Sequence, residues 1–351
     1  MAQEVVVKVP VCDATVSPAK VKTGYNQDIS KLFMNLPNYP EPGQVNRSSQ
    51  LLFNERLYVR QKKGDQLCCE APHIAYSNEH GELNNIFWLP VSAIVFSSCL
   101  SNEERAAIPD LYSQKTYAHC LPSIALTYAW QDPLSKMTYS FGTRFVHEPT
   151  LDTATEYGIR FNTYKDKKVC KTRISRDKAC LHYPRSIQES RQLFVRYLKA
   201  WAHNNYSIYI WGGMSHRGLD CSGLVLRAAQ LAGAPYFYRT TLTLAHFLKP
   251  LKEGDVLQEG DLIFHEGHVM IVSDIKNNRL IESASLPETG WGRVHELPLS
   301  SVFKNITTYK DLLQLYHKPK PYKLERLHKD GHVYRVVDTI KIFRFATIFD
   351  T

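Results

Sequence analysis

The stretch GLDCSGLVLRAAQLAG, residues 218–233, holds a cysteine where small and polar residues give way to an apolar repeat of helical spacing. The pattern predicts a helix that begins at Cys221, between Asp220 and Ser222. A helix start lowers the pKa of a thiol, and its unpaired N–H groups can hold an oxyanion. The position therefore suits a nucleophile, which also needs a base such as an oriented histidine. A buried cysteine in a helix cap is the alternative.

Around this stretch the second half of the chain predicts helices followed by strands. Residues 186–204 have apolar residues at helical spacing, and Ser186 with Glu189 forms a capping box. Residues 206–213 predict a strand that runs into a Gly-Gly turn, and residues 259–285 predict strands with a turn at Asn277 and Asn278. This order indicates an α+β domain. Residues 331–349 hold one more predicted strand pair.

The first half of the chain predicts β structure. Short runs rich in Val, Leu, Tyr and Phe alternate with turn residues in two clusters, within residues 51–96 and 137–177. Residues 51–71 predict two strands joined at a KKGD turn, and residues 101–114 predict a linker with a short helical turn. Both clusters suggest small twisted barrels.

Composition narrows the class of protein. A chain of 351 residues is too long for one ordinary core, and its 44% hydrophobic and 22% charged residues are typical of a soluble globular protein. No apolar run reaches transmembrane length, and the first residues lack the features of a signal peptide. The eight cysteines include no CxxC pair, which favours free thiols. We therefore expect a cytoplasmic protein, with export by a signal-independent route left open.

The net charge of +9 raises nucleic acid as a partner. The densest basic run, residues 165–178, lacks interleaved aromatics of the RNA-binding kind, and neither zinc-finger spacing nor a helix-turn-helix pattern is present. We therefore interpret the run as solvated strands and turns, and expect no nucleic-acid partner.

Three motifs in order resemble the NlpC/p60 family of cell-wall cysteine peptidases, a papain-like group. They are YIWGG at residues 209–213, GLDCSGLV at 218–225 and EGDLIFHEGHVMIV at 259–272, within a resemblance over about residues 186–317. The resemblance makes Cys221 the nucleophile and His268 the base, with His265 the poorer candidate for the base. Tyr209 falls on the tyrosine that directs its hydroxyl at the oxyanion.

The third catalytic position departs from the family pattern. The resemblance places Glu282, within LIESAS at residues 280–285, where the family usually has His, Asn or Gln. A carboxylate there can accept the Nδ1–H of His268, as an aspartate does in other triads. A metal site is the weaker reading of HEGH at residues 265–268, because its histidines are three apart rather than the four of a zinc-binding helix.

The β clusters resemble the two N-terminal bacterial SH3-like domains of one NlpC/p60 subgroup. That resemblance assigns Glu55, within LLFNERLYV, to the free amine of a peptide's L-Ala, with Asn54 in place of the family's glycine. Asp220 would share the amine, because two carboxylates make a negative pocket. Ser222 would line the same pocket. Arg239 and Thr241 loosely match a substrate-binding region in which a glutamine has become Leu244.

The fold class expected is two small all-β SH3-like barrels followed by an α+β papain-like catalytic domain. The expected domains are residues 1–105, the first SH3-like domain; 106–183, the second; 184–317, the NlpC/p60 peptidase domain; and 318–351, a C-terminal extension. They form a multidomain chain that we expect to be monomeric and to need no cofactor.

The function that the resemblance implies is a cysteine endopeptidase that cleaves the γ-D-glutamyl–diamino acid bond of peptidoglycan stem peptides with a free N-terminal L-Ala. Such an enzyme would serve fragment recycling or wall remodelling. Two alternatives stay open. One is an amidase, acyltransferase or transglutaminase-like enzyme on the same fold, and the other is a non-catalytic module that binds wall peptide or a protein.

Overall fold

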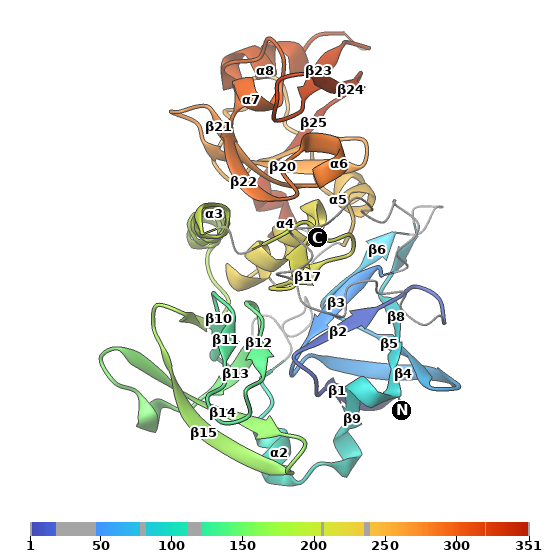
Figure 1. Cartoon of the computed structure of the whole chain (residues 1–351), viewed down its shortest axis with the longest axis vertical. Coiled ribbons are helices and arrows are strands. Elements are labelled where there is room, and N and C mark those ends of the chain that lie inside the picture. The colour runs from blue at the N-terminus through green and yellow to red at the C-terminus, as the bar shows by residue number, and fades with distance from the viewer. Residues whose placement is uncertain are drawn as a thin grey trace.

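Three five-stranded antiparallel sheets organise the chain, two in its N-terminal half and one in its C-terminal half. The computed structural model describes residues 2–18, 47–77, 82–110, 121–204, 207–234, 239–319 and 321–349. The two N-terminal sheets lie at one end of the molecule, helices α3 (Ile187–His203) and α4 (Cys221–Leu231) lie in the middle, and the third sheet lies beyond them (Figure 1). In the described part of the chain, none of the helices combines the length and the apolar character that crossing a membrane requires.

The first sheet forms from short apolar runs separated by turns. Its strand order is β8 (Ile86–Pro90), β5 (Gln66–Glu70), β4 (Arg56–Lys63), β1 (Gln3–Val7) and β9 (Ile94–Phe96). The hairpin predicted at KKGD is confirmed, and Gly64 supplies its positive φ of 60°. Two short ladders accompany it, β2 (Val11–Ala14) with β3 (Ser49–Leu52) and β6 (Tyr76–Ser77) with β7 (Leu83–Asn84).

The second sheet has an aromatic core that also contains Phe53, a residue from the segment that forms the first sheet. Its order is β15 (Lys168–Ser175), β14 (Glu156–Thr163), β13 (Arg144–His147), β10 (Ser123–Leu126) and β16 (Ala179–His182), beside the ladder of β11 (Trp130–Gln131) and β12 (Thr138–Tyr139). Phe53, from the turn after β3, packs its ring 4.9 Å from that of Tyr139. The predicted helical turn in the linker is α2 (Asn102–Ala106), and residues 111–120 lie outside the described residues.

Neither N-terminal sheet closes within the described residues. No ladder there joins β8 to β9, or β15 to β16. The predicted closed barrels are therefore not found, although the predicted antiparallel β structure is. Period-2 alternation fixes which side chains of a strand are buried, but it does not fix whether the outer strands of a sheet meet.

The third sheet carries the cysteine helix on one face. Its order is β22 (Arg293–Pro298), β21 (Arg279–Ala284), β20 (His268–Asp274), β19 (Leu262–His265) and β25 (Lys341–Phe343). Val269 and Ile271 share a core with residues of α3 and α4, whereas Met270 and Val272 belong to a second core. That second core also contains residues of α7 (Leu299–Val302), α8 (Tyr309–Tyr316) and β23 (Leu324–Leu327).

The C-terminal extension is part of this sheet. We predicted a strand pair within residues 331–349, but β24 (Val333–Val337) pairs with β23, and β25 pairs with β19. The ring of Phe345 stacks on Phe194 of α3 at 4.6 Å. The predicted pairing is wrong because a strand's partner depends on tertiary contacts and not on its own sequence.

The two helices before the sheet follow their local signals. The Ser186–Glu189 capping box begins α3, and Asp220 is the N-cap of α4. The strand predicted at residues 206–213 is reduced to a single bridge between Ile208 and Arg293, with residues 205 and 206 outside the described residues. The remaining helices are α5 (Thr241–Phe247) and α6 (Leu286–Thr289), and β17 (Met214–Ser215) pairs with β18 (Gly218–Leu219).

Candidate active site

Cys221 is the first residue of α4 and packs against the sheet. The Asp220 carboxylate caps the helix by accepting the N–H of Gly223 at 2.7 Å. A Cβ at Gly223 would collide with the carbonyl oxygen of Gly213, so the close approach of α4 to this turn requires glycine. The backbone N–H groups of Val269 and Ser222 point at the Cys221 sulfur. The structure thus brings the thiol to the backbone that directly follows His268.

The thiol of Cys221 is in its neutral form, contrary to the expectation from the helix start. Burial and then the Asp220 carboxylate raise the pKa of the Cys221 thiol to about 12, outweighing the backbone N–H groups and Arg239, which lower it. Only 6% of the residue is exposed. A reaction at this sulfur therefore needs a base that takes the proton as the sulfur attacks.

His268 is the first residue of β20, and its Nε2 atom lies 2.6 Å from Oε2 of Glu282 on β21. We predicted that Nδ1 of His268 contacts Glu282; the two side chains do lie together, but the assignment to Nδ1 is wrong. With Nε2 turned toward Glu282, Nδ1 is the ring nitrogen left for the thiol. The ring makes no hydrogen bond to the Cys221 sulfur within the described residues. Catalytic hydrogen bonds often tighten only when substrate binds.

Glu282 is the centre of a buried cluster, two members of which, His295 and Arg326, were not predicted from the sequence. Nη2 of Arg326 donates to both carboxylate oxygens, at 3.1 Å to Oε1 and 2.8 Å to Oε2, and Nε2 of His295 lies 3.1 Å from Oε1. Burial alone would raise the pKa of Glu282, but Arg326 and the two histidines hold it well below its usual value. His295 stands opposite Glu282 in the β21–β22 ladder, a register that the sequence does not show. Arg326 lies 44 residues further along the chain.

His265 has a different environment from His268. Its Nδ1 contacts the carbonyl oxygen of Glu266 at 3.0 Å, and its Nε2 lies 3.0 Å from Nη1 of Arg326. Burial, followed by Arg326, lowers the pKa of His265 to about 2, so the ring is neutral. Both ring nitrogens are engaged, which agrees with the preference for His268 as the candidate base.

The groups predicted to bind an amine at the helix start are paired with one another. Arg239 donates to both carboxylate oxygens of Asp220 and to the Ser222 hydroxyl, and 2% of Arg239 is exposed. Asp220 also accepts the N–H of Gly212 at 2.9 Å. Arg239 was predicted to contact a substrate carboxylate, but its Nη1 and Nη2 groups are already engaged in this buried pairing.

Glu55 pairs with a different arginine from Asp220. Oε1 accepts from Nη1 of Arg227 on α4 at 2.9 Å, and Oε2 lies 3.1 Å from Nε2 of His73. Burial would raise the pKa of Glu55, yet Arg227 and His73 lower it to about 2. The negative pocket predicted from Glu55 and Asp220 is therefore not formed, since each carboxylate is neutralised by a different buried arginine. The sequence did not reveal these partners because they are distant along the chain.

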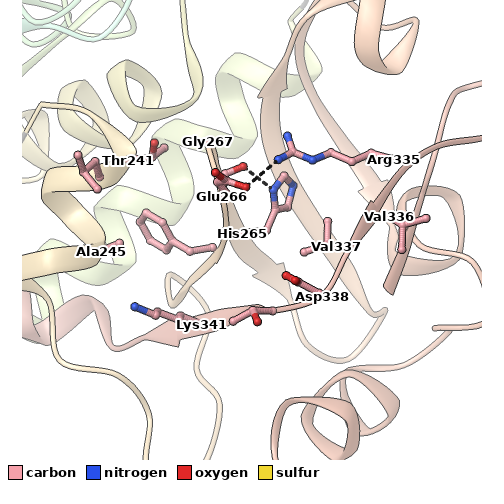
Figure 2. Close-up of a pocket in the computed structure, with 13 residues that line it drawn as sticks. Thr241, Ala245, His265, Glu266, Gly267, Arg335, Val336, Val337, Asp338 and Lys341 are labelled. Atoms are coloured by element: carbon pink, nitrogen blue, oxygen red, sulfur yellow. Dashed lines mark hydrogen bonds and ion pairs between the residues drawn. The ribbon is translucent and has the colours of Figure 1, made fainter. Parts of the chain in front are cut away.

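Tyr209 and Thr241 are the remaining predicted site residues. Tyr209 is buried, and its backbone N–H donates to the carbonyl of Gly292 at 2.9 Å. Thr241 is the first residue of α5 and lines a pocket of about 450 Å³. Figure 2 shows this pocket between α5, the turn before His268 and the segment that runs from Arg335 on β24 through Asp338 to Lys341 at the start of β25. Arg335 and Glu266 form an ion pair of 3.8 Å at its edge.

Comparisons with known proteins agree with this geometry. Residues 207–296 match the model of the NlpC/P60 family. A solved NlpC/P60 family protein from Bacillus cereus ATCC 10987 has a TM-score of 0.56 at 15% identity, over 84% of this chain and 94% of that one, which shows a similar fold. Dipeptidyl-peptidase 6 of Lysinibacillus sphaericus is 45% identical over 65 residues, 18% of this chain. That match spans 23% of the relative's length.

The chain therefore contains an NlpC/P60 family domain, whose matched segment includes Cys221, His268, Glu282 and Tyr209. The family includes peptidases that hydrolyse peptidoglycan, and the matching relative is named a peptidase. Arg326 and the rest of the C-terminal extension lie beyond the matched segment.

Proposed function

We propose that this protein is a cysteine endopeptidase that hydrolyses the γ-D-glutamyl–diamino acid bond of peptidoglycan stem peptides with a free N-terminal L-Ala. The observation that carries the proposal is the meeting of Cys221, at a capped helix start, with the first residues of β20, where His268 is held by Glu282. A thiol, an imidazole and an orienting carboxylate are the parts that nucleophilic acyl transfer requires.

The proposed reaction begins with attack of the Cys221 sulfur on the γ-carbonyl carbon while His268 takes the thiol proton. N–H groups of the first turn of α4 and the Tyr209 hydroxyl would stabilise the oxyanion. Collapse breaks the C–N bond, and His268 gives its proton to the leaving amine. A water molecule, deprotonated by His268, then hydrolyses the thioester and releases the γ-D-glutamyl product. Glu282 remains ionised and holds the ring throughout.

The contacts of the N-terminal half with the catalytic domain favour a substrate whose N-terminal amine is free. We propose that its two sheets are SH3-like modules, of which the first closes the groove. Arg47 donates to the carbonyl of Trp211 at 3.1 Å, and the carbonyl of Arg47 lies so close to Gly212 that a Cβ there would collide with it. Ser77 donates its N–H to the Thr243 hydroxyl at 2.6 Å. We propose that this packing excludes a sugar linked to the L-Ala nitrogen.

We assign the diamino acid on the leaving side to the pocket in Figure 2. The pocket is lined by the turn Glu266–Gly267, directly before the histidine that would protonate the leaving amine. Residues of the C-terminal extension also line it, whereas Arg47 and Ser77 of the N-terminal half contact Gly212 and Thr243. Two cations, Arg335 and Lys341, and two anions, Glu266 and Asp338, suit a residue that bears both an amino and a carboxyl group.

Mass spectrometry of the products tests the proposed function. L-Ala-γ-D-Glu-diaminopimelate is incubated with the wild type and with Cys221→Ala. We expect L-Ala-D-Glu and free diaminopimelate from the wild type alone. Intact substrate after prolonged incubation with the wild type, or cleavage at the L-Ala–D-Glu bond, would contradict the proposal.

A further inference from the structure

Arg326 is a buried cation contributed by the C-terminal extension. It lies on β23, whose hairpin with β24 covers the face of the third sheet opposite to α4. None of the residue is exposed, and its guanidinium lies 5.3 Å from the ring centre of Phe303. A buried arginine is costly unless its charge is balanced and its N–H groups are bonded.

The balancing charge is Glu282. Nη2 of Arg326 lies 3.1 Å from Oε1 and 2.8 Å from Oε2 of that carboxylate, and Nη1 reaches Nε2 of His265 at 3.0 Å. Glu282 in turn lies 2.6 Å from Nε2 of His268. One guanidinium therefore contacts the carboxylate that holds the candidate base and also the neighbouring histidine.

We propose that Arg326 is a positioning residue that acts through Glu282, fixing its carboxylate and balancing its charge so that His268 can serve as a base. The inference rests on the proposed cysteine-peptidase function. It gives the C-terminal extension a part in the active site, although the extension lies outside the matched family segment.

The physical reason is charge balance at a buried site. An unpaired buried carboxylate beside an imidazole would either take a proton itself or hold the ring as imidazolium. In the first case the carboxyl O–H donates to Nε2 and the ring proton stays on Nδ1, and in the second case both ring nitrogens carry a proton, so Nδ1 cannot accept the thiol proton in either. The Arg326 charge opposes both outcomes, because it favours ionised Glu282 and disfavours a second positive charge on the ring.

Several titratable groups surround this pair, and any pH effect belongs to the set. The groups that face Glu282 or Arg326 are His268 on β20, His295 on β22, His265 on β19, Tyr334 on β24 and Glu288 of α6. Substitutions at Arg326 and Glu282 must therefore be compared as a cycle rather than singly.

The test measures kcat, KM and the pH profile of stem-peptide cleavage for Arg326→Met, Arg326→Lys, Glu282→Gln and the Arg326→Met/Glu282→Gln double variant. Glu325→Gln is the matched control, since it lies on the same strand in a half-exposed ion pair with Lys304. For Arg326→Met we expect kcat to fall by about tenfold or more with KM unchanged. We expect the acidic limb of the pH profile of cleavage to move up by about one pH unit, because Glu282 loses the positive charge that balances it. Arg326→Lys and Glu325→Gln should keep the wild-type limb.

The double variant gives a result even if Arg326→Met does not fold. Loss of both charges should return the acidic limb toward the wild type and lower kcat no further than Glu282→Gln alone. An additional loss of about tenfold beyond Glu282→Gln would show that Arg326 acts independently of Glu282 and would overturn the inference. The inference would also be overturned if folded Arg326→Met had the kcat of the wild type and the same acidic limb in its pH profile of cleavage.

A second readout needs no substrate. The pH dependence of Cys221 alkylation by iodoacetamide, followed by peptide mass spectrometry, reports the ability of His268 to remove the thiol proton. If the wild type cleaves no stem peptide but Arg326→Met moves this profile upward, the proposed function fails and the positioning role stands. If the wild type cleaves stem peptides but Arg326→Met moves neither the pH profile of cleavage nor that of alkylation, the positioning role fails and the proposed function stands.

Discussion

Nε2 of His268 and Oε2 of Glu282 lie 2.6 Å apart on β20 and β21, two adjacent strands of the third sheet on which the helix that presents the thiol packs. The contact turns the other ring nitrogen, Nδ1, away from the carboxylate. The contact therefore fixes the orientation of the imidazole, the candidate base.

Replacement of Cys221 by alanine should remove turnover. No other described group combines a helix start with the backbone of β20, so we expect kcat to fall by about a thousandfold or more, as for other catalytic nucleophiles. Steady-state assay of stem-peptide cleavage measures the loss, and circular dichroism checks the fold. The control is Cys99→Ala, because Cys99 is an exposed free cysteine. Activity above about a tenth of wild type in Cys221→Ala would exclude the proposed mechanism.

The buried pair of Asp220 and Arg239 should tune the thiol in opposite directions. Asp220 raises the pKa of Cys221 and Arg239 lowers it. We therefore expect Asp220→Asn to move the pH profile of Cys221 alkylation to lower pH and Arg239→Gln to move it to higher pH. Mass spectrometry of the Cys221 peptide measures both, with Cys221→Ala as the background. Shifts of the same sign would show that helix capping, and not charge, dominates at this site.

The Glu55–Arg227 pair should make the folded chain sensitive to acid. The pKa of Glu55 is lowered to about 2 from 4.5, so its stabilisation is present above pH 4.5 and is lost as the pH falls toward 2. Over that window we expect the wild type to lose about 3 kcal/mol that Glu55→Gln lacks throughout. Urea unfolding at neutral pH and at two acidic values measures the difference. Identical pH dependence in the two proteins would contradict the assignment.

The same substitution separates a structural role for Glu55 from binding of an amine. Because Arg227 and His73 already occupy the carboxylate, Glu55→Gln should leave the ratio of kcat/KM for free and N-acetylated peptide unchanged. If this ratio is instead about tenfold smaller in Glu55→Gln than in the wild type, Glu55 binds the amine of the substrate.

Arg335 should select the leaving residue. If the diamino acid lies in the pocket of Figure 2, its second carboxylate can reach Arg335 or Lys341. We expect Arg335→Gln to lower kcat/KM for the diaminopimelate peptide about tenfold, because a charge-assisted contact is lost, and to leave the lysine peptide unchanged. Lys329→Gln, a charge change outside this pocket, is the control. Equal losses for both peptides would place the leaving residue elsewhere.

Local signals made part of this site predictable. The capping box of α3, the start of α4 at Cys221 and the hairpin around Gly64 depend on residues a few positions apart, and the structure agrees with the sequence at each. The order of the NlpC/p60 motifs pointed to the segment that the family model matches. Predictions that depended on partners distant along the chain were less accurate. The pairing of β24 and β25 was wrong, and so was the joint pocket of Glu55 and Asp220.

The sequence by itself determined where α3 and α4 begin and which cysteine and histidine stand at the starts of α4 and β20, because capping and periodicity act over one or two turns of chain. Only the tertiary structure decided which charges are balanced. Arg326 reaches Glu282 across 44 residues, Arg227 reaches Glu55 across 172, and Arg239 reaches Asp220 across 19. A buried carboxylate takes its properties from the cation that folding places beside it, and that neighbour is set by packing rather than by position along the chain.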